Sequence, residues 1–234
     1  MTRSRPGADA IWLEATLGLR LSDDALLTRA LTHRSAGGLD NERLEFLGDA
    51  VLSFVMAELL FARFAEASEG DLSRYRSSLV SGEVLADVGE LLNIGEHLRL
   101  GAGELKSGGF RRRSILADAV EALLGAVFID GGMEAARGVI GRLWSARVQA
   151  LTETPPPKDP KTQLQEWLQG RGEALPVYAV EQVSGLPHRQ VFSVRLSIEA
   201  LSIQTSGEGT TRRRAEQQAA VQALALIETK KDLP

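Results

Sequence analysis

Hydrophobic residues recur at intervals of three and four positions between residues 23 and 151, which is the spacing of amphipathic helices. Glycine-rich or acidic stretches interrupt this pattern and are expected to end the helices. No stretch in this part shows convincing two-residue alternation of polarity. The pattern therefore predicts an all-α first domain, with helices in the following segments: 23–35, 43–64, 72–92, 113–130 and 133–151.

The pattern changes in the last third of the chain. Residues 161–172 predict a short helix that ends at glycine, and residues 210–228 predict a longer helix with Thr210 or Thr211 as its N-cap. Stretches rich in β-branched residues with alternating polarity lie between them, at 176–184, 190–198 and 200–209. This α-β-β-β-α order predicts an α+β domain in which two helices cover one face of an antiparallel sheet.

A proline-rich stretch separates the two parts. "TETPPPKDPK" (152–161) has four prolines between positions 155 and 160, which exclude a helix and favour an extended spacer. We therefore expect a first domain over residues 1–152, a linker over 153–160 and a second domain over 161–229.

Charge adds a difference between the two parts. The chain of 234 residues has a net charge of −4, yet residues 158–234 hold 10 Lys and Arg against 9 Asp and Glu, whereas the remainder holds 17 against 22. Neither part is a polycation. Any contact with a nucleic acid must therefore depend on individually placed residues.

The composition also limits the chemistry and the compartment. The chain has no cysteine, so neither a disulfide nor a thiolate metal site is available. Residues 1–18 make a poor signal peptide, because acids at positions 9 and 14 interrupt any apolar segment. No uncharged apolar run reaches the length of about 18 residues that a membrane span needs. We expect a soluble, cytoplasmic protein without a membrane partner.

Two predicted helices carry acids in unusual places. Glu42, Glu45 and Asp49 are spaced i, i+3, i+7 and share one face of a predicted helix. Apolar residues flank that face on both sides. Asp118 and Glu121 are the only ionisable groups in residues 114–129 and also share a face. A helix that is apolar nearly all round is expected to be buried. The second pair in particular therefore needs positive compensation.

The sequence leaves several sources of compensation open. A solvated acidic stripe is the simplest interpretation, and it suits Glu42, which lies in the first turn after Asp40 or Asn41 as a predicted N-cap. A buried carboxylate instead costs several kcal/mol unless it is paired. The basic stretch "FRRRS" (110–114) is one candidate partner, and a hard divalent cation such as Mg²⁺ or Mn²⁺ is another.

These motifs resemble the ribonuclease III family of double-stranded-RNA endonucleases. "NERLEFLGDAVL" (41–52) and "ILADAVEALLGAVFID" (115–130) resemble its two acidic motifs, and "ALTHRS" (30–35), "GDLSRYRSSLVS" (70–81) and "LRLGAGELKSGGFRRRS" (98–114) match its pattern in the same order. The tail resembles the family's double-stranded-RNA-binding domain. The resemblance implies an all-α ribonuclease III endonuclease domain followed by an α-β-β-β-α RNA-binding domain.

The resemblance also assigns roles to the acids. It implies that Glu45, Asp49, Asp118 and Glu121 are the catalytic carboxylates and form the metal site, with Glu45, Asp118 and Glu121 as direct ligands. The implied cofactor is Mg²⁺, with Mn²⁺ as a substitute. All four acids are present in this sequence, which argues against an inactive homologue.

Three other residues take roles from the same resemblance. Glu42 would lie at the margin of the site, and Glu69 would have an auxiliary role, with a solvated loop acid as the alternative. Phe46 would enter a socket on a second subunit, so that the endonuclease domain forms a homodimer; a core aromatic is the alternative. A two-fold dimer places two copies of the site across one RNA groove.

The second domain carries the residues expected to contact RNA. Arg212, Arg213 and Arg214 stand at a helix N-terminus, where positive charge opposes the helix dipole by about 0.3–1 kcal/mol each, so we expect a phosphate-binding turn. Glu216 stands where many such domains have lysine, and it either weakens phosphate affinity or faces elsewhere. Contacts to the RNA minor groove are expected from one face of the first tail helix and from the loop after the first strand: Thr162, Gln165, Glu166, Gln169 and His188.

The implied activity is hydrolysis of double-stranded RNA to 5′-phosphate and 3′-hydroxyl ends with two-nucleotide 3′ overhangs. The implied roles are processing of ribosomal-RNA precursors and of some messenger and transfer RNAs. One alternative is a non-catalytic double-stranded-RNA-binding assembly factor that keeps the fold. A metal-dependent DNA nuclease is another.

Overall fold

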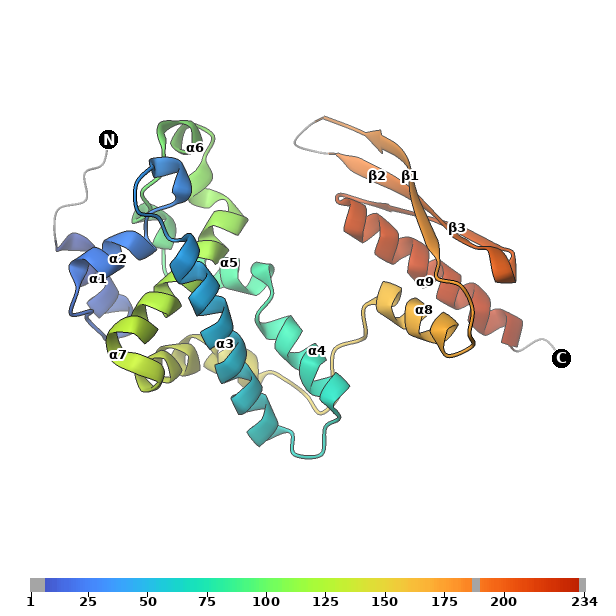
Figure 1. Ribbon diagram of the computed structural model, residues 1–234, viewed down its shortest axis with the longest axis horizontal. Helices are drawn as coiled ribbons and strands as arrows, with labels where there is room; N and C mark the ends of the chain where they lie inside the picture. Colours follow the sequence, from blue (N-terminus) through green and yellow to red (C-terminus); the bar gives the residue numbers. More distant parts are fainter. Residues whose placement is uncertain (1–6, 187–189, 232–234) are drawn as a thin grey trace. The chain divides into compact units, whose positions relative to one another are not determined.

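The protein is described by a computed structural model, which places residues 7–186 and 190–231 (Figure 1). The chain divides into two compact units, Met1–Pro156 and Pro157–Pro234, and each unit has a hydrophobic core of its own. The break between them falls among the prolines of the spacer.

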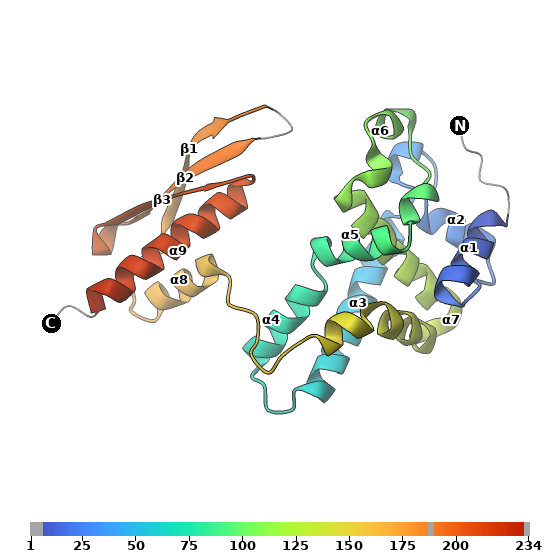
Figure 2. The same cartoon turned by 180° about the vertical axis from the view of Figure 1, so that it is seen from behind.

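The described part of the first unit is built from helices and the loops between them, with one isolated parallel bridge between Thr32 and Arg99. Its helices are α1 (Ala8–Leu17), α2 (Asp24–Ala30), α3 (Glu42–Arg63), α4 (Glu69–Leu79), α5 (Gly82–Leu91), α6 (Ala102–Lys106) and α7 (Arg113–Gln149). Helices α3 and α7 pack against each other more extensively than any other pair, and α5 covers α7 (Figures 1 and 2). Leu52, Met56 and Trp144 are among its fully buried side chains.

The structure corrects three details of the predicted helices. Helices α1 and α6 lie in stretches for which no helix was predicted, and α6 falls in a glycine-rich stretch that was expected to separate helices. The segment 72–92, predicted as one helix, is two, because the hydroxyl of Ser81 accepts the N–H of Val84 and starts α5. The predicted break before residue 133 is present as a kink inside α7, where Gly132 has a φ of 71°.

Two glycines allow α3 and α7 to cross closely. A Cβ atom on Gly48 would overlap the backbone carbonyl of Glu121, and one on Gly125 would overlap the carbonyl of Leu44. Any larger residue at either position would push the helices apart. The backbone contact therefore fixes the separation of the two helices that carry the acidic motifs.

The second unit has the predicted order, with α8 (Pro160–Gln169), β1 (Val177–Ser184), β2 (Val191–Ile198), β3 (Ile203–Gly209) and α9 (Arg212–Lys231). Its three strands form an antiparallel sheet in the order β1-β2-β3, and the register of β1 shifts between Val180 and Gln182. Both helices lie on one face of the sheet (Figure 2). The predicted α-β-β-β-α class is confirmed.

Candidate active site

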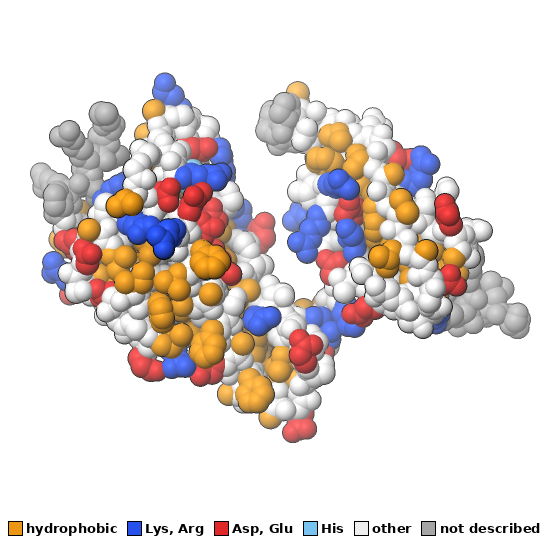
Figure 3. Space-filling view, viewed as in Figure 1, with side chains coloured by type: hydrophobic (Ala, Val, Ile, Leu, Met, Phe, Trp, Pro, Cys, Tyr) orange, Lys and Arg blue, Asp and Glu red, His pale blue; other side chains and the backbone are white. Residues whose placement is uncertain are grey.

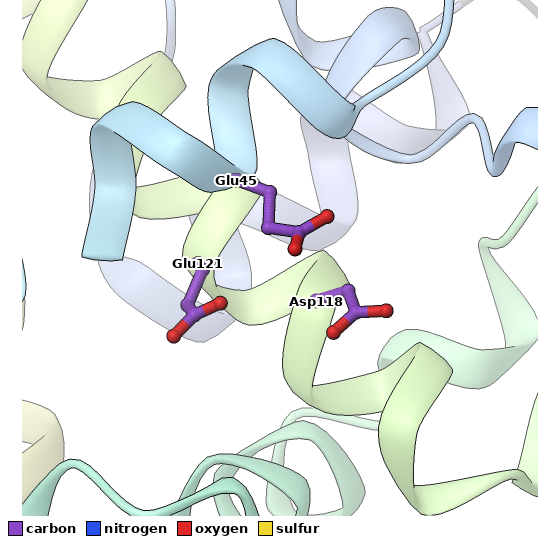
Figure 4. A group of neighbouring side chains, drawn as sticks. All are labelled: Glu45, Asp118 and Glu121. Atoms are coloured by element: carbon purple, nitrogen blue, oxygen red, sulfur yellow. The ribbon is translucent and has the colours of Figure 1, made fainter.

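Three acids from the two crossing helices meet beside the glycine contact. Glu45 comes from α3, whereas Asp118 and Glu121 come from neighbouring turns of α7 (Figure 4). One carboxylate oxygen from each residue lies within 4.8 Å of those of the other two. The three side chains are half-buried, so water does not fully screen their repulsion. Such a set of oxygen donors fits a hard divalent cation.

The basic-partner alternative fails within the described residues. There, none of these three carboxylates forms an ion pair with lysine or arginine. Arg112 instead pairs with Glu104 at 3.0 Å, and Arg113 pairs with acids of α5, including Asp87 at 2.6 Å. Of the compensations that the sequence left open, a cation therefore fits the site best.

The pKa shifts reflect the same crowding of negative charge. Burial raises the pKa of Glu121 to about 8, and the charges of Asp49, Glu45 and Asp118 add to the effect in that order. Burial is also the main cause that raises the pKa of Asp118, which the charges of His33 and Arg34 oppose. Without a cation, full ionisation of this cluster is therefore unfavourable.

The other predicted acids lie around the cluster or away from it. Asp49 is exposed on α3, outside the three-oxygen group, although its charge acts on Glu121. Glu42 is exposed at the start of α3 and accepts Arg34 Nη1 at 3.2 Å. Glu69 is exposed at the start of α4, where it accepts the hydroxyl of Ser73 at 2.9 Å. The geometry therefore separates a central trio from marginal acids.

A half-enclosed cleft of about 450 Å³ opens beside Glu45 and Asp118. Its other lining residues include four that sequence reasoning did not assign to the site: Arg34, Ser35, Glu104 and Ser114. His33, also in the wall, was interpreted as structural, and its Nδ1 does accept the N–H of Ser35 at 3.2 Å. The family matches "ALTHRS" (30–35) and "LRLGAGELKSGGFRRRS" (98–114) were the signals in the sequence that pointed to this wall, because they contain these residues.

Phe46 does not belong to the core. It is 80% exposed, although it lies next to a residue of the acid cluster on α3. Phe54 and Phe61 on the same helix are 51% and 73% exposed. Hydrophobic side chains gather over this part of the surface (Figure 3). An exposed aromatic stripe of this kind is typical of a protein interface.

The predicted RNA-contacting residues of the second unit lie on the surface. Those of α8 are all exposed: Thr162, Gln165, Glu166 and Gln169. Arg212, Arg213 and Arg214 are exposed in the first turn of α9, where the hydroxyl of Thr211 accepts the N–H of Arg214 at 3.2 Å. His188 lies outside the described residues. Glu216 is buried and faces the inside of this unit.

Comparison with known proteins also divides the chain into two parts. Residues 23–147 match the family model described as Ribonuclease-III-like, and residues 160–227 match the double-stranded RNA binding motif. Proteins named Ribonuclease 3 from Vibrio vulnificus and Pseudomonas fluorescens are 52% and 54% identical; the alignments cover 91% and 92% of this chain and 94% of each relative.

A solved structure supports the helical unit. The nuclease domain of ribonuclease III from Campylobacter jejuni is 43% identical and matches 58% of this chain and 95% of its own, with a TM-score of 0.57. Its description refers to a region involved in dimer formation.

A helical domain with a carboxylate cluster, joined to a double-stranded RNA binding motif, defines a metal-dependent ribonuclease. The chain belongs to the ribonuclease III family and is an endoribonuclease. The enzyme prediction is thus confirmed. Among the described residues, no helix has the length and apolarity that crossing a membrane requires.

Proposed function

We propose that the protein is a Mg²⁺-dependent endoribonuclease that hydrolyses double-stranded RNA. The products are 5′-phosphate and 3′-hydroxyl ends with two-nucleotide 3′ overhangs. The observation that carries the proposal is the convergence of Glu45, Asp118 and Glu121 within 4.8 Å, since hard oxygen ligands suit Mg²⁺ or Mn²⁺. Matches to both domains over most of the chain support the choice of substrate.

In this proposal some acids of the site bind the cation, and others act around it. Glu45, Asp118 and Glu121 hold the cation, and Asp49 adds negative charge beside Glu121. A bound divalent cation acidifies water and neutralises charge that develops on the phosphate. Glu42 keeps Arg34 at the rim of the cleft, where the guanidinium can meet the RNA backbone.

The two domains have separate tasks in this proposal. Residues 1–152 form the catalytic domain, 153–160 the linker and 161–229 the RNA-binding domain. Phe46 joins two catalytic domains in a homodimer, so that the two sites cut opposite strands. The exposed face of α8 and the arginines of α9 bind the duplex by its shape and phosphates. Glu69 has an auxiliary role.

The cellular roles follow from the family. We infer a cytoplasmic enzyme that processes ribosomal-RNA precursors and some messenger and transfer RNAs. The relatives that support this inference are the bacterial proteins named Ribonuclease 3.

The substitution Glu121→Ala tests the proposal. The variant is expected to bind a defined RNA hairpin as the unmodified protein does, yet to lose at least about a hundredfold in cleavage rate, because one of three ligands is gone. Cleavage is measured with and without Mg²⁺, and the product ends are mapped. A matched DNA duplex is expected to stay intact.

Glu14→Ala is the control, since Glu14 is an exposed acid on α1, away from the cluster. Cleavage by Glu121→Ala at the unmodified rate would overturn the site assignment. Cleavage of the DNA duplex would favour the DNA-nuclease alternative. Binding without cleavage by the unmodified protein would favour the assembly factor.

A further inference from the structure

A buried acid joins the first turns of α8 and α9. Glu216 is only 7% exposed, and its two carboxylate oxygens accept hydrogen bonds from different helices. One bond comes from Lys161 of α8, and the other comes from Arg212 Nε at 2.8 Å. Lys161 also lies over the ring of Tyr178, 4.6 Å from its centroid. Because a buried carboxylate is stable only when it is paired, Glu216 restrains both cations.

A second acid makes a similar link nearby. Asp159 caps α8 by accepting the N–H of Lys161 at 2.9 Å. Its other oxygen accepts Gln217 Nε2 at 2.8 Å and lies 3.4 Å from Arg213 Nη2. Each carboxylate therefore ties the start of α8 to one of the exposed arginines of α9.

Both acids stay ionised in these surroundings. Burial acts to raise the pKa of Glu216, but the hydrogen bonds from Lys161 and Arg212 lower it overall. Burial likewise acts to raise the pKa of Asp159, and the hydrogen bonds from Gln217 and the backbone of Lys161 lower it overall. The links are therefore charged near neutral pH.

The link at Glu216 leaves Arg212 able to bind a phosphate. Glu216 has two cationic partners, so the group of three carries one surplus positive charge. The side chain of Arg212 is 63% exposed, compared with 33% for Lys161. When Arg212 donates to a phosphate, Lys161 still neutralises the buried carboxylate.

We propose that Glu216 and Asp159 are positioning residues that hold Arg212 and Arg213 where an RNA phosphate meets them. This inference rests on the proposed contact between the arginine turn and duplex RNA. Glu216 supplies no contact to the phosphate; it orders the groups that do.

The sign of one substitution separates positioning from simple charge balance. Removing a negative charge beside a phosphate site strengthens binding if net charge alone matters. If Glu216 orders its partners, Glu216→Gln weakens binding, because the freed side chains must lose rotamer freedom when RNA binds. We expect affinity to fall by about three- to tenfold, a coupling usual for residues in direct contact.

The measurement uses the full chain and a blunt RNA duplex, in buffer without divalent cations so that the RNA stays intact. Dissociation constants are determined over a series of salt concentrations. Glu228→Gln is the matched control, since it removes the same charge from an exposed site near the other end of α9. With Mg²⁺ present, Glu216→Gln is expected to raise KM for cleavage and to leave kcat unchanged. Unchanged or tighter binding by folded Glu216→Gln overturns the inference.

A double-mutant cycle distinguishes this inference from the proposed function. Arg212→Gln is expected to weaken binding, and Glu216→Gln is expected to add little in that background. If Arg212→Gln binds normally, the proposed RNA contact itself is wrong. If Arg212→Gln binds RNA more weakly but Glu216→Gln binds normally, the RNA contact stands and the positioning role of Glu216 is wrong. Should Glu216→Gln fail to fold, Asp159→Asn gives the same test through Arg213, because Asp159 is less buried.

Discussion

At the scale of single residues, Glu121 links the stability of the protein to pH. Its pKa of about 8 in the folded chain compares with 4.5 for a free glutamate. Between these pH values the folded state keeps a proton that the unfolded chain has released. The free energy of unfolding therefore falls as pH rises through this window when no cation is bound.

Glu121→Gln tests this linkage. We expect the variant to lose less stability than the unmodified protein between about pH 4.5 and 8, since the shifted group is gone. Urea unfolding in the presence of a chelator, repeated across this pH range, measures the effect. Glu14→Gln on α1 serves as the control and should keep the original slope. An identical slope for Glu121→Gln would show that the shift is absent.

The individual residues of the site were predictable to different degrees. Spacing placed Asp118 and Glu121 on one face of an apolar helix, and the family resemblance paired them with Glu45. Spacing left the partner of these acids open, because it does not show where Arg112 points. The exposure of Phe46 and the burial of Glu216 also depend on packing between distant segments. Hydrophobic spacing alone would have placed Phe46 in the core and Glu216 on the surface.

At the scale of elements, the crossing of α3 and α7 brings the two acidic motifs together. We expect Gly125→Ala to destabilise the protein by about 1–3 kcal/mol, because the new methyl group overlaps the carbonyl of Leu44 and forces the helices apart. Cleavage should fall further than the loss of folded protein explains, since the acids separate. Thermal unfolding and cleavage assays measure the two effects.

Gly138→Ala provides the matched control on the same helix. A Cβ atom there meets nothing within 4 Å in the described structure, so helix propensity alone should apply. The expected change is a gain of about 0.5–1 kcal/mol in stability with normal cleavage. Equal effects of the two substitutions would mean that the close crossing does not set the site.

The limits of the helices show what a sequence pattern can reveal about elements. The division into a helical part and an α-β-β-β-α part follows from periodicity, and both parts are confirmed. The boundary inside 72–92 was missed because apolar residues continue in register across Ser81, while the cap is one local hydrogen bond. Helix α1 was missed as well, although Leu13 and Leu17 are buried in the core.

At the scale of the whole molecule, the exposed aromatic residues of α3 bear on assembly. Phe46 is 80% exposed and does not belong to the hydrophobic core of the single subunit. Its place beside Glu45 means that a partner subunit on this surface would lie next to the acid cluster. Dimer formation and double-strand cleavage would then depend on the same helix.

Phe46→Ala separates assembly from folding. We expect self-association to weaken by about 2 kcal/mol or more, roughly thirtyfold, because a buried aromatic at the centre of an interface contributes most of the binding energy. The stability of the single subunit should change by less than about 0.5 kcal/mol, since the side chain is exposed there. Sedimentation over a range of protein concentrations measures the association. Leu91→Ala, which removes a 67% exposed side chain from α5, should leave the self-association unchanged.

Cleavage of both strands by Phe46→Ala should fail at low protein concentration and recover at high concentration. A Phe46→Ala variant that associates normally would place the interface elsewhere.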